Sequence, residues 1–593
     1  MREKYRTDTG CLILTNQFIM AALILIQDIF MPSFAHHALR RGLFGAATAS
    51  SLLAITGVFQ RYHDLVQGED GFSQHTRKEH KANLISGMHS PLMPNREQHA
   101  MFMQNFPQYA HLLPTALDAF RRQQALKTPV KIRALSDCPT ILSYENSGTL
   151  IVGGAPALMS AAASIKKNSN LTYLNDERRW PIAYGSAWHL EQDAETEAPT
   201  TFKPTTFMAS QIRRATVGYV SQVSIEKTGL FPWRTLDWIG WIHHPELWIP
   251  GIKLAFDFQL ATMANPQQRQ AMLKKLAAQC KANQGYYDAL NEAVGGQLLL
   301  PGKGSIIVAR NEEEVADLLA MKENLAKENR ELKLLSKADM KERYGFVPNG
   351  QMYGEKTHDR VLSPNYMSIL TTYIKKQGGK IINGTLTTVY IDYKTSGGIA
   401  EYQTGDGQKV LIPFSRLIMS LGSQPILDEK DRPLFDVVAA RGVSVLAYAH
   451  VPRGYQLPPV MVCGGTNHVT KLSEHPVIVQ GEDGKQYDQY LLRMTAGACI
   501  TPNVSSQDSV DYDGSIAVGL IASARQTLKD CIIEPIMVFG CNRQVSKHGQ
   551  TNWMHPFSGI HIQYGAGGGG LTRAPDFAVN DEQQHASSLT NRR

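Results

Sequence analysis

The chain has 593 residues, of which 43% are hydrophobic and 19% are charged, and its 60 basic and 53 acidic residues give a formal net charge of +7. This composition is typical of a globular protein with a large core, and it excludes a disordered chain, a collagen, a disulfide scaffold and a polytopic membrane protein. The mild charge comes without a block of lysines or arginines, so nucleic acid is not an expected partner. The 7 cysteines are scattered without a CxxC pair, so no metal site is predicted, although one disulfide in an oxidising compartment stays open.

Residues 1–60 are interpreted as an export signal or membrane-proximal segment. Arg40 and Arg41 precede an uncharged stretch over residues 42–59, a pattern typical of the bacterial Tat signal, which exports folded proteins. The expected location is therefore the periplasm or the inner membrane, with peripheral membrane contact through the apolar stretch. A short amphipathic helix beside two chance arginines, in a cytoplasmic protein, is the alternative.

A polar stretch over residues 61–147 is expected to form a helical extension. The apolar run 149–152 then predicts a buried parallel strand, followed by a glycine turn at 153–154 and an apolar helix. Residues 171–174 predict a second buried strand, so this segment is a βαβ unit.

The rest of the chain is predicted to alternate helices and strands. Its expected elements are a charged helix over 311–335, a helix over 366–377, strands at 380–382, 386–391 and 410–422, an antiparallel sheet within 440–545 and a late strand at 559–564.

The turn after the first strand carries part of a dinucleotide-binding fingerprint. In the pattern G-x-G-x-x-G, the glycines allow a tight turn, close approach of the pyrophosphate and close helix packing, and the helix N-terminus faces the phosphates. Gly153 keeps the first position, whereas Ala155 fills the second and Leu158 the third. An ordinary strand, glycine turn and helix is the alternative interpretation.

An acidic residue is expected at the end of the second strand, where it binds the ribose hydroxyls. Asn175 takes that place and Asp176 follows it. Two alternatives stay open: a slip of one residue brings Asp176 into the site, or Asn175 binds the ribose as a neutral group.

A second glycine-rich run, Gly565–Gly570, follows the late strand and leads into Leu571 and Thr572. A flexible linker is the alternative, but linkers rarely follow an alternating strand pattern. Two glycine turns at opposite ends of the chain indicate one discontinuous nucleotide-binding domain, with a second domain inserted between its parts.

Seven stretches in order resemble the D-amino-acid oxidase superfamily of FAD enzymes, and within it the D-amino-acid dehydrogenases. They are residues 149–162, 241–267, 296–308, 359–389, 416–422, 540–549 and 565–572. The sequence departs from the family pattern at Ala155, Leu158, Gln544 and Ala566, so it resembles a divergent member.

The resemblance implies an α/β fold, α+β overall, in which a discontinuous Rossmann-like FAD-binding domain carries an inserted antiparallel-sheet substrate domain. The expected divisions are an export segment at 1–60, a helical extension at 61–147, FAD-binding parts at 148–240, 376–425 and 541–580, a mixed helical and substrate region at 241–375, the substrate sheet at 426–540 and a polar tail at 581–593.

FAD is the implied cofactor. By the resemblance, the residues expected to bind it are Gly153, Gly154, Ala155, Pro156, Ala157, Asn175, Asp176, Val389, Gly422, Gly565, Gly567, Gly568, Gly569, Gly570, Leu571 and Thr572.

The implied reaction oxidises the carbon–nitrogen bond of a D-amino acid or related amine, by hydride transfer to flavin N5, with quinone or oxygen as the electron acceptor. Arg543 matches the arginine of the family's Gly-x-Arg-Pro turn and is the candidate clamp for the substrate carboxylate. Tyr353 is a second candidate catalytic residue near the expected pocket, with a structural role as its alternative. Two other functions stay open: an FAD-dependent 2-hydroxy-acid dehydrogenase, and a non-catalytic protein with a flavin-binding fold.

Overall fold

The structure is a computed structural model of the full chain, which divides into two compact units, Met1–Gln60 and Arg61–Arg593. All described residues lie in the second unit. They are 96–113, 125, 128–140, 142–144, 147–167, 170–176, 285–300, 304–327, 331–356, 361–395, 397–422, 424–435, 437–463, 467–481, 483–501, 517, 520–521, 523–546, 552–555, 559–564 and 574. Residues 96, 313, 317, 320, 324–325, 327, 437–441, 496–501, 539–546 and 552–555 are described by their backbone alone.

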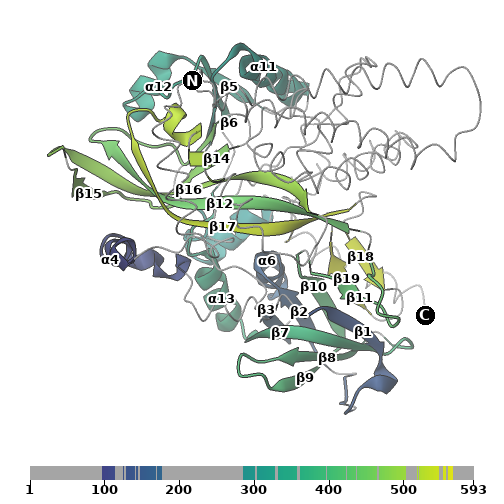
Figure 1. Cartoon of the computed structure of the whole chain (residues 1–593). Coiled ribbons are helices and arrows are strands. Elements are labelled where there is room, and N and C mark those ends of the chain that lie inside the picture. Colours follow the sequence, from purple (N-terminus) through teal and green to yellow (C-terminus); the bar gives the residue numbers. More distant parts are fainter. Residues whose placement is uncertain are drawn as a thin grey trace, which may run out of the picture. The chain divides into compact units, whose positions relative to one another are not determined.

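The described strands form two multi-strand sheets, so the fold is mixed α/β. The first sheet has ten strands in the order β11-β1-β7-β3-β2-β10-β19-β18, with β8 beside β7 and β9 beside β8. Its strands, which come from three separate stretches of the chain (Figure 1), are β1 (Val130–Ala134), β2 (Thr149–Gly153), β3 (Leu171–Asp176), β7 (Lys380–Ile391), β8 (Gly398–Gln403), β9 (Lys409–Phe414), β10 (Arg416–Ser420), β11 (Ile426–Leu427), β18 (Asn552–His555) and β19 (Ile560–Gln563).

The second sheet has nine described strands, in the order β17-β12-β16-β14-β13-β4-β6-β5, with β15 beside β16. Its longest strands, β12, β16 and β17, run antiparallel, as predicted for residues 440–545. The strands are β4 (Ser305–Ala309), β5 (Leu332–Leu335), β6 (Met352–Lys356), β12 (Val437–Pro452), β13 (Val460–Cys463), β14 (Asn467–Lys471), β15 (Val477–Gln480), β16 (Gln486–Thr501) and β17 (Ile532–Ser546).

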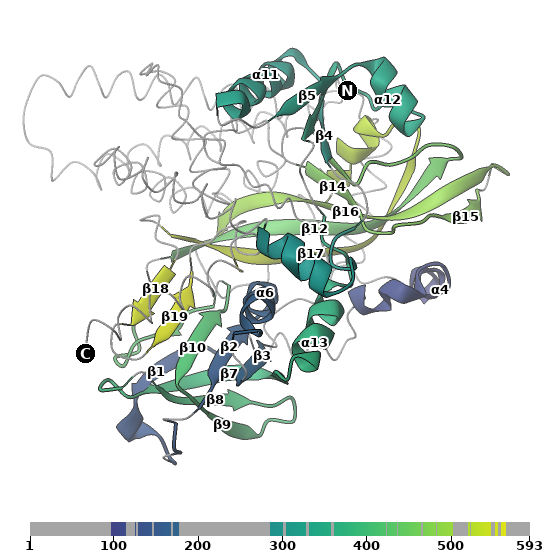
Figure 2. The same ribbon diagram turned by 180° about the vertical axis from the view of Figure 1, so that it is seen from behind.

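The described helices are α4 (Arg96–Asn105), η1 (Pro107–Leu112), η2 (Leu135–Asp137), α6 (Ala155–Ser164), α11 (Glu312–Lys327), α12 (Lys337–Tyr344) and α13 (Tyr366–Lys376). Two of them, α6 and α13, cover one face of the first sheet. α6 and α13 share a core with the sheet that includes Leu158, Tyr173 and Leu370. The other face is covered by β8 and β9, whose core with β3 and β7 includes Leu174 and Val389. Figures 1 and 2 show α6 and α13 between the first sheet and the long strands of the second.

The βαβ unit and the helix expected at 366–377 are confirmed by β2, α6, β3 and α13. The two short strands expected at 380–382 and 386–391 are instead the single strand β7. Gly384 lies between the two expected strands, and a Cβ there would lie 2.5 Å from the ring of Tyr402 in β8. The glycine therefore allows the strand to pass close to its neighbour.

Three other expected elements differ from the structure. The stretch 410–422 forms two strands, since β9 pairs with β8 whereas β10 pairs with β2. The charged helix predicted over 311–335 ends at Lys327, and Leu332 and Leu335 are buried in β5 through its pairing with β6. The stretch 61–147, expected to be helical, also contains β1, where Val130 and Ile132 alternate with charged residues and are buried.

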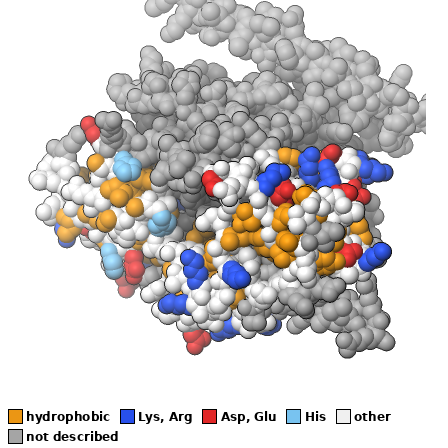
Figure 3. All heavy atoms as spheres, turned by 90° about the horizontal axis from the view of Figure 1, so that it is seen from below, with side chains coloured by type: hydrophobic (Ala, Val, Ile, Leu, Met, Phe, Trp, Pro, Cys, Tyr) orange, Lys and Arg blue, Asp and Glu red, His pale blue; other side chains and the backbone are white. Residues whose placement is uncertain are grey.

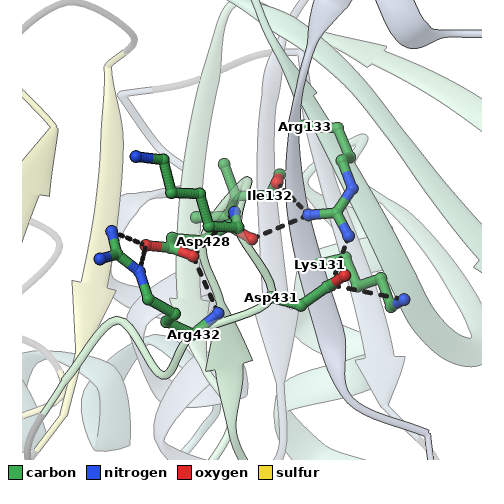
Figure 4. A network of polar contacts seen from close by, with 7 residues as sticks. Lys131, Ile132, Arg133, Asp428, Asp431 and Arg432 are labelled. Atoms are coloured by element: carbon green, nitrogen blue, oxygen red, sulfur yellow. Dashed lines mark hydrogen bonds and ion pairs between the residues drawn. The ribbon is translucent and has the colours of Figure 1, made fainter.

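A polar network fastens β1 to the turn that follows β11 (Figure 4). The guanidinium of Arg133 donates to the backbone oxygen of Asp428 at 2.8 Å and pairs with the carboxylate of Asp431. Lys131 lies 3.5 Å from the same carboxylate, and Arg432 pairs with Asp428 at 2.8 Å. The network holds an N-terminal strand in the first sheet by charge as well as by backbone pairing.

β9 is the outer strand of the β7-β8-β9 layer, and it begins with Lys409, which pairs with Glu401 at 3.1 Å. Figure 3, seen from the side on which β9 lies in Figure 1, shows lysines and arginines among the hydrophobic side chains of the described surface. A charged residue such as Lys409 discourages an edge strand from pairing with another chain.

Candidate cofactor-binding site

The turn after β2 requires a glycine. Gly153 has a φ of +140°, and a Cβ at this position would lie 2.1 Å from the backbone oxygen of Ser420 in the neighbouring strand β10. The same Cβ would lie 3.1 Å from Cβ of Ala157 in the helix. The chain can therefore turn sharply from β2 into α6 only because Gly153 has no side chain.

The N-terminus of α6 presents backbone donors. Gly154 caps the helix without a side-chain hydrogen bond, and its carbonyl accepts from the N–H of Leu158 at 3.0 Å. Pro156 has no N–H, whereas the N–H groups of Ala155 and Ala157 have no partner within the helix. Such a terminus, with the positive end of the helix dipole, favours a phosphate group.

Leu158 stands where the fingerprint has its third glycine. Its side chain is fully buried in the core that α6 shares with the sheet. The departure from the pattern therefore fills the interior beneath α6 and leaves the glycine turn itself unchanged.

The buried hydroxyl of Tyr173 lies against this turn. It is 2.9 Å from the backbone oxygen of Gly153, 3.3 Å from that of Gly154 and 3.3 Å from Oδ1 of Asn175. Its single proton faces three acceptors, and the contact to Gly153 is the shortest. Tyr173 therefore joins the turn to the end of the next strand.

The carboxyl ends of four parallel strands, β3, β2, β10 and β19, meet at the turn beside the first half of β7. Gly153 is in register with Ser420 on one side and with Asn175 on the other, and Asn175 is in register with Asn383 in β7. The row continues past Ser420, whose hydroxyl donates to Oε1 of Gln563 in β19 at 3.0 Å. Amides and a hydroxyl thus flank the glycine turn, and ligands of open α/β sheets bind at such an edge.

Asp176 faces away from the turn. Its carboxylate is buried, with 2% of the residue exposed, and accepts from the backbone N–H of Leu386 at 3.2 Å. Side chains alternate along a strand, so Asp176 shares the face of Leu174, in the core with β8 and β9. The acidic group therefore serves the opposite face of the sheet.

The second glycine-rich run, with Gly565, Gly567–Gly570, Leu571 and Thr572, lies outside the described residues. Both flanks are described: Tyr564 stacks on Phe435 with ring centroids 4.0 Å apart, and Ala574 is fully buried. The carbonyl of Ala574 accepts from the Ser160 hydroxyl in α6 at 2.6 Å.

Two further expected cofactor residues lie apart from the register row. Gly422 follows β10 with a φ of +64°. Val389 is fully buried inside β7, in register with Ile132 in β1 and Ala400 in β8. The structure therefore puts Val389 in the sheet interior, five residues beyond the end of the β3–β7 pairing at Gly384.

Tyr353, the second candidate catalytic residue, lies in β6 of the second sheet. Its hydroxyl donates to the backbone oxygen of Pro348 at 2.6 Å and lies 3.0 Å from that of Gly350. Burial raises the pKa of Tyr353, which keeps the hydroxyl protonated as a donor. These contacts give Tyr353 a structural role in holding the 348–350 turn.

Arg543 is described by its backbone alone. It lies near the end of β17, in register with Ala440 in β12. The next described strand after β17 is β18, and its first residue, Asn552, pairs with Gln563 at the row beside the glycine turn. The chain therefore runs from the strand that carries Arg543 directly to the candidate cofactor edge.

Other kinds of site receive no support within the described ranges. They contain no group of three or more His, Cys, Asp or Glu side chains that could hold a metal ion. No helix found in those ranges has the length and apolar character needed to cross a membrane. Arg40 and Arg41, on which the export prediction rests, lie outside the described residues.

Sequence reasoning missed four residues of this site: Tyr173, Asn383, Ser420 and Gln563. Tyr173 carried a usable signal, since it lies two residues before Asn175 on a strand and therefore shares its face. Asn383, Ser420 and Gln563 carried none, because strand pairing between distant stretches of the chain brings them to Gly153.

Comparisons with known proteins identify a family for the C-terminal part of the chain. A sequence model of the family described as "FAD dependent oxidoreductase" matches residues 237–578, more than half of the chain. A sequence comparison with curated proteins finds no match.

Several solved structures are similar to the chain. Glycine oxidase from Geobacillus kaustophilus has 14% identity and a TM-score of 0.42, over 73% of this chain and 92% of that one. Iminodiacetate oxidase from Chelativorans sp. BNC1 has 12% identity and a TM-score of 0.43, over 73% and 93%. A mutant of amadoriase I from Aspergillus fumigatus has 14% identity and a TM-score of 0.43, over 76% and 88%.

Proposed function

Because the chain belongs to the FAD dependent oxidoreductase family, we propose that it oxidises the carbon–nitrogen bond of a D-amino acid or a related amine. The family makes it an FAD-dependent oxidoreductase. We interpret the first sheet as a discontinuous Rossmann-like FAD-binding domain, and the second sheet as the substrate domain inserted into it.

The glycine turn at Gly153 is the observation that carries this proposal. A side chain there would meet the Ser420 backbone at 2.1 Å, and the turn leads into a helix N-terminus that has no side-chain cap. The fit to a dinucleotide is good, because the N–H groups of Ala155 and Ala157 suit a pyrophosphate and the flanking amides suit hydroxyl groups. Asn175, in register with Gly153, is better placed for the ribose than Asp176, which is bound to Leu386 on the other face.

In this reaction the main task of the protein is to position the substrate. FAD, when bound, would supply the two-electron acceptor for the hydride that leaves the substrate α-carbon. The substrate amine must be neutral, with its C–H held at near-attack distance, and the resulting imine is hydrolysed by water. An amine substrate therefore needs little acid–base machinery, whereas a 2-hydroxy acid needs a base for its hydroxyl proton.

Arg543 is the proposed clamp for the substrate carboxylate. Support comes from the sequence "GCNRQVSKHG", which resembles the family's arginine turn, and from the short connection between β17 and the cofactor edge. A guanidinium binds a carboxylate through two parallel hydrogen bonds, so it selects amino acids over simple amines.

The electron acceptor is proposed to be a quinone or oxygen. Support for a quinone comes from the twin arginine, Arg40-Arg41, and the apolar stretch after it, which predict Tat export to the periplasm with peripheral contact to the inner membrane. A folded, cofactor-loaded enzyme suits this export route.

A visible spectrum of the full chain, purified from a Tat-competent host, tests the function. We expect flavin bands near ~450 nm that bleach on anaerobic addition of a D-amino-acid mixture. Parallel additions of L-amino acids and of 2-hydroxy acids are the controls. Bleaching by hydroxy acids alone would replace amine oxidation with the dehydrogenase alternative, and a protein that binds no added FAD would contradict the enzymatic function.

A further inference from the structure

Two asparagine side chains lie side by side at the cofactor edge of the first sheet. Asn175 at the end of β3 is in register with Asn383 in β7, and its Nδ2 donates to Oδ1 of Asn383 at 2.6 Å. Asn175 is half-buried and Asn383 is exposed. The pair therefore lies on the β3–β7 side of the row of residues that includes Gly153.

Both side chains face the N-terminus of α6. Tyr173 and Ile381, two residues before each asparagine, pack in the core beneath α6. Side chains two apart on a strand share a face, so Asn175 and Asn383 point to the side on which the glycine turn opens into the helix. The carboxylate of the adjacent Asp176 accepts its hydrogen bond from Leu386 on the opposite face.

Tyr173 orients this pair. Its hydroxyl contacts the backbone oxygen of Gly153 at 2.9 Å and Oδ1 of Asn175 at 3.3 Å. The tyrosine is 1% exposed, so the geometry is fixed by the core. The turn that faces the pyrophosphate and the amide pair are therefore connected by one buried hydroxyl.

The remaining hydrogen-bonding groups suit a vicinal diol. Each sugar hydroxyl both donates and accepts a hydrogen bond. With Nδ2 of Asn175 directed at Asn383, its Oδ1 has acceptor capacity, and Nδ2 of Asn383 has two N–H donors. A donor and an acceptor lie next to each other, without a negative charge.

We propose that Asn383 completes a neutral two-amide clamp with Asn175 for the adenosine ribose diol of FAD, and that Tyr173 is its positioning residue. This inference rests on the proposed function. It assigns to β7 a cofactor contact beside Asn175, which stands where the fingerprint has an acidic residue.

The test titrates apoprotein with FAD, with FAD whose adenosine ribose lacks its 2′-hydroxyl, and with FMN, which has no adenosine. Asn383→Leu removes the amide at similar volume. We expect the Kd of this variant for FAD to rise ~10-fold, because one hydrogen bond to the ribose is lost. Its Kd for FMN should not change. The control is Asn105→Leu, which removes an asparagine that bonds to Gln489 in the second sheet. This variant should change neither the Kd for FAD nor the Kd for FMN.

The 2′-deoxy analogue tests positioning by Tyr173. The wild type should bind FAD ~10-fold more tightly than the analogue. Tyr173→Phe should reduce this preference to less than ~3-fold, whereas Tyr373→Phe in the same core should keep it. A loss of thermal stability alone would not change the ratio of the two affinities.

The outcomes separate the clamp from the proposed function. A wild type that binds FAD, with an Asn383→Leu variant of equal affinity, would overturn the clamp and leave the function standing. An equal loss of FAD and FMN affinity would also overturn it, because the defect would not involve the ribose. A wild type that binds no FAD would overturn both proposals.

Discussion

The hydroxyl of Ser160 donates to the backbone oxygen of Ala574 at 2.6 Å, although the two residues lie 414 positions apart. Ser160 lies in α6, the helix that follows the first glycine turn, and Ala574 follows the second glycine-rich run. Both are buried in the helix-side core of the first sheet. The helix after the first glycine motif and the downstream flank of the second are therefore fastened together.

Ser160→Ala should loosen this connection. The variant leaves the Ala574 carbonyl buried without its partner, which costs about 1–3 kcal/mol of unfolding free energy. We expect a lower midpoint in urea and a several-fold weaker affinity for FAD. Ser164→Ala is the matched control, because Ser164 is equally buried but bonds within α6, to the Ser160 carbonyl at 2.9 Å. Equal effects of the two variants would contradict a role for the connection.

Gly153→Ala should disrupt the turn itself. The new Cβ would lie 2.1 Å from the Ser420 backbone oxygen, in a backbone with a φ of +140°. We therefore expect the free energy of unfolding to fall by at least ~1–3 kcal/mol. We also expect the variant to lose its ability to bind FAD. Gly484→Ala separates conformation from contact, since Gly484 has a φ of +75° and nothing within 4 Å of its Cβ position. The free energy of unfolding of this variant should fall by about 1 kcal/mol, and the variant should still bind FAD. Thermal unfolding measures the stability of each variant, and the amount of flavin bound per chain measures its FAD binding. A Gly153→Ala protein that still binds FAD would contradict the proposed role of the turn.

Arg543→Lys tests the carboxylate clamp. Lysine keeps the charge but loses the two-pronged geometry, so KM for an amino acid should rise ~10-fold or more while the flavin spectrum is unchanged. A simple amine without a carboxylate should be oxidised equally well by both proteins. An unchanged KM for the amino acid would remove Arg543 from the substrate site. Steady-state kinetics on the two substrates supply the measurement.

The network around β1 should make the protein sensitive to acid. The hydrogen bond from Arg133 holds the pKa of Asp431 below its usual range, and bonds from Arg432 do the same for Asp428. A carboxyl with a lowered folded pKa stabilises the fold above its unfolded pKa of about 3.9, and this contribution disappears as the pH falls through the folded value.

Arg133→Met should therefore reduce the stability lost between pH 5 and pH 3, as measured by urea unfolding. The pair is exposed, so its effect should be modest and should shrink in 1 M salt. A variant with the same acid sensitivity as the wild type at low salt would show that Asp431 contributes nothing.

The sequence was sufficient for the elements whose signal is local. The apolar runs that became β2 and β3, and the helical periodicity of α13, predicted their elements to within two residues. β7 could not be predicted as one strand, because Asn383-Gly384 is typical of a turn. The close approach of β8, at the Tyr402 ring and the Gln403 backbone oxygen, explains the glycine.

The residues of the candidate site also divide into those with a local sequence signal and those without one. Gly153 and Asn175 could be placed because the fingerprint lies within one βαβ unit. The contact of Asn383 with Asn175 depends on β3–β7 pairing across 208 positions, which no local pattern encodes. The face taken by Asp176 became clear only from its bond to Leu386.

The affinity of the apoprotein for FAD relative to FMN tests the central claim most directly. The helix N-terminus after Gly153 and the edge at Asn175 are proposed to hold the pyrophosphate and the adenosine, and FMN lacks the adenosine monophosphate half. The account predicts that FAD binds at least ~100-fold more tightly than FMN. Equal affinities, or no binding of either flavin, would contradict a dinucleotide site at this sheet edge.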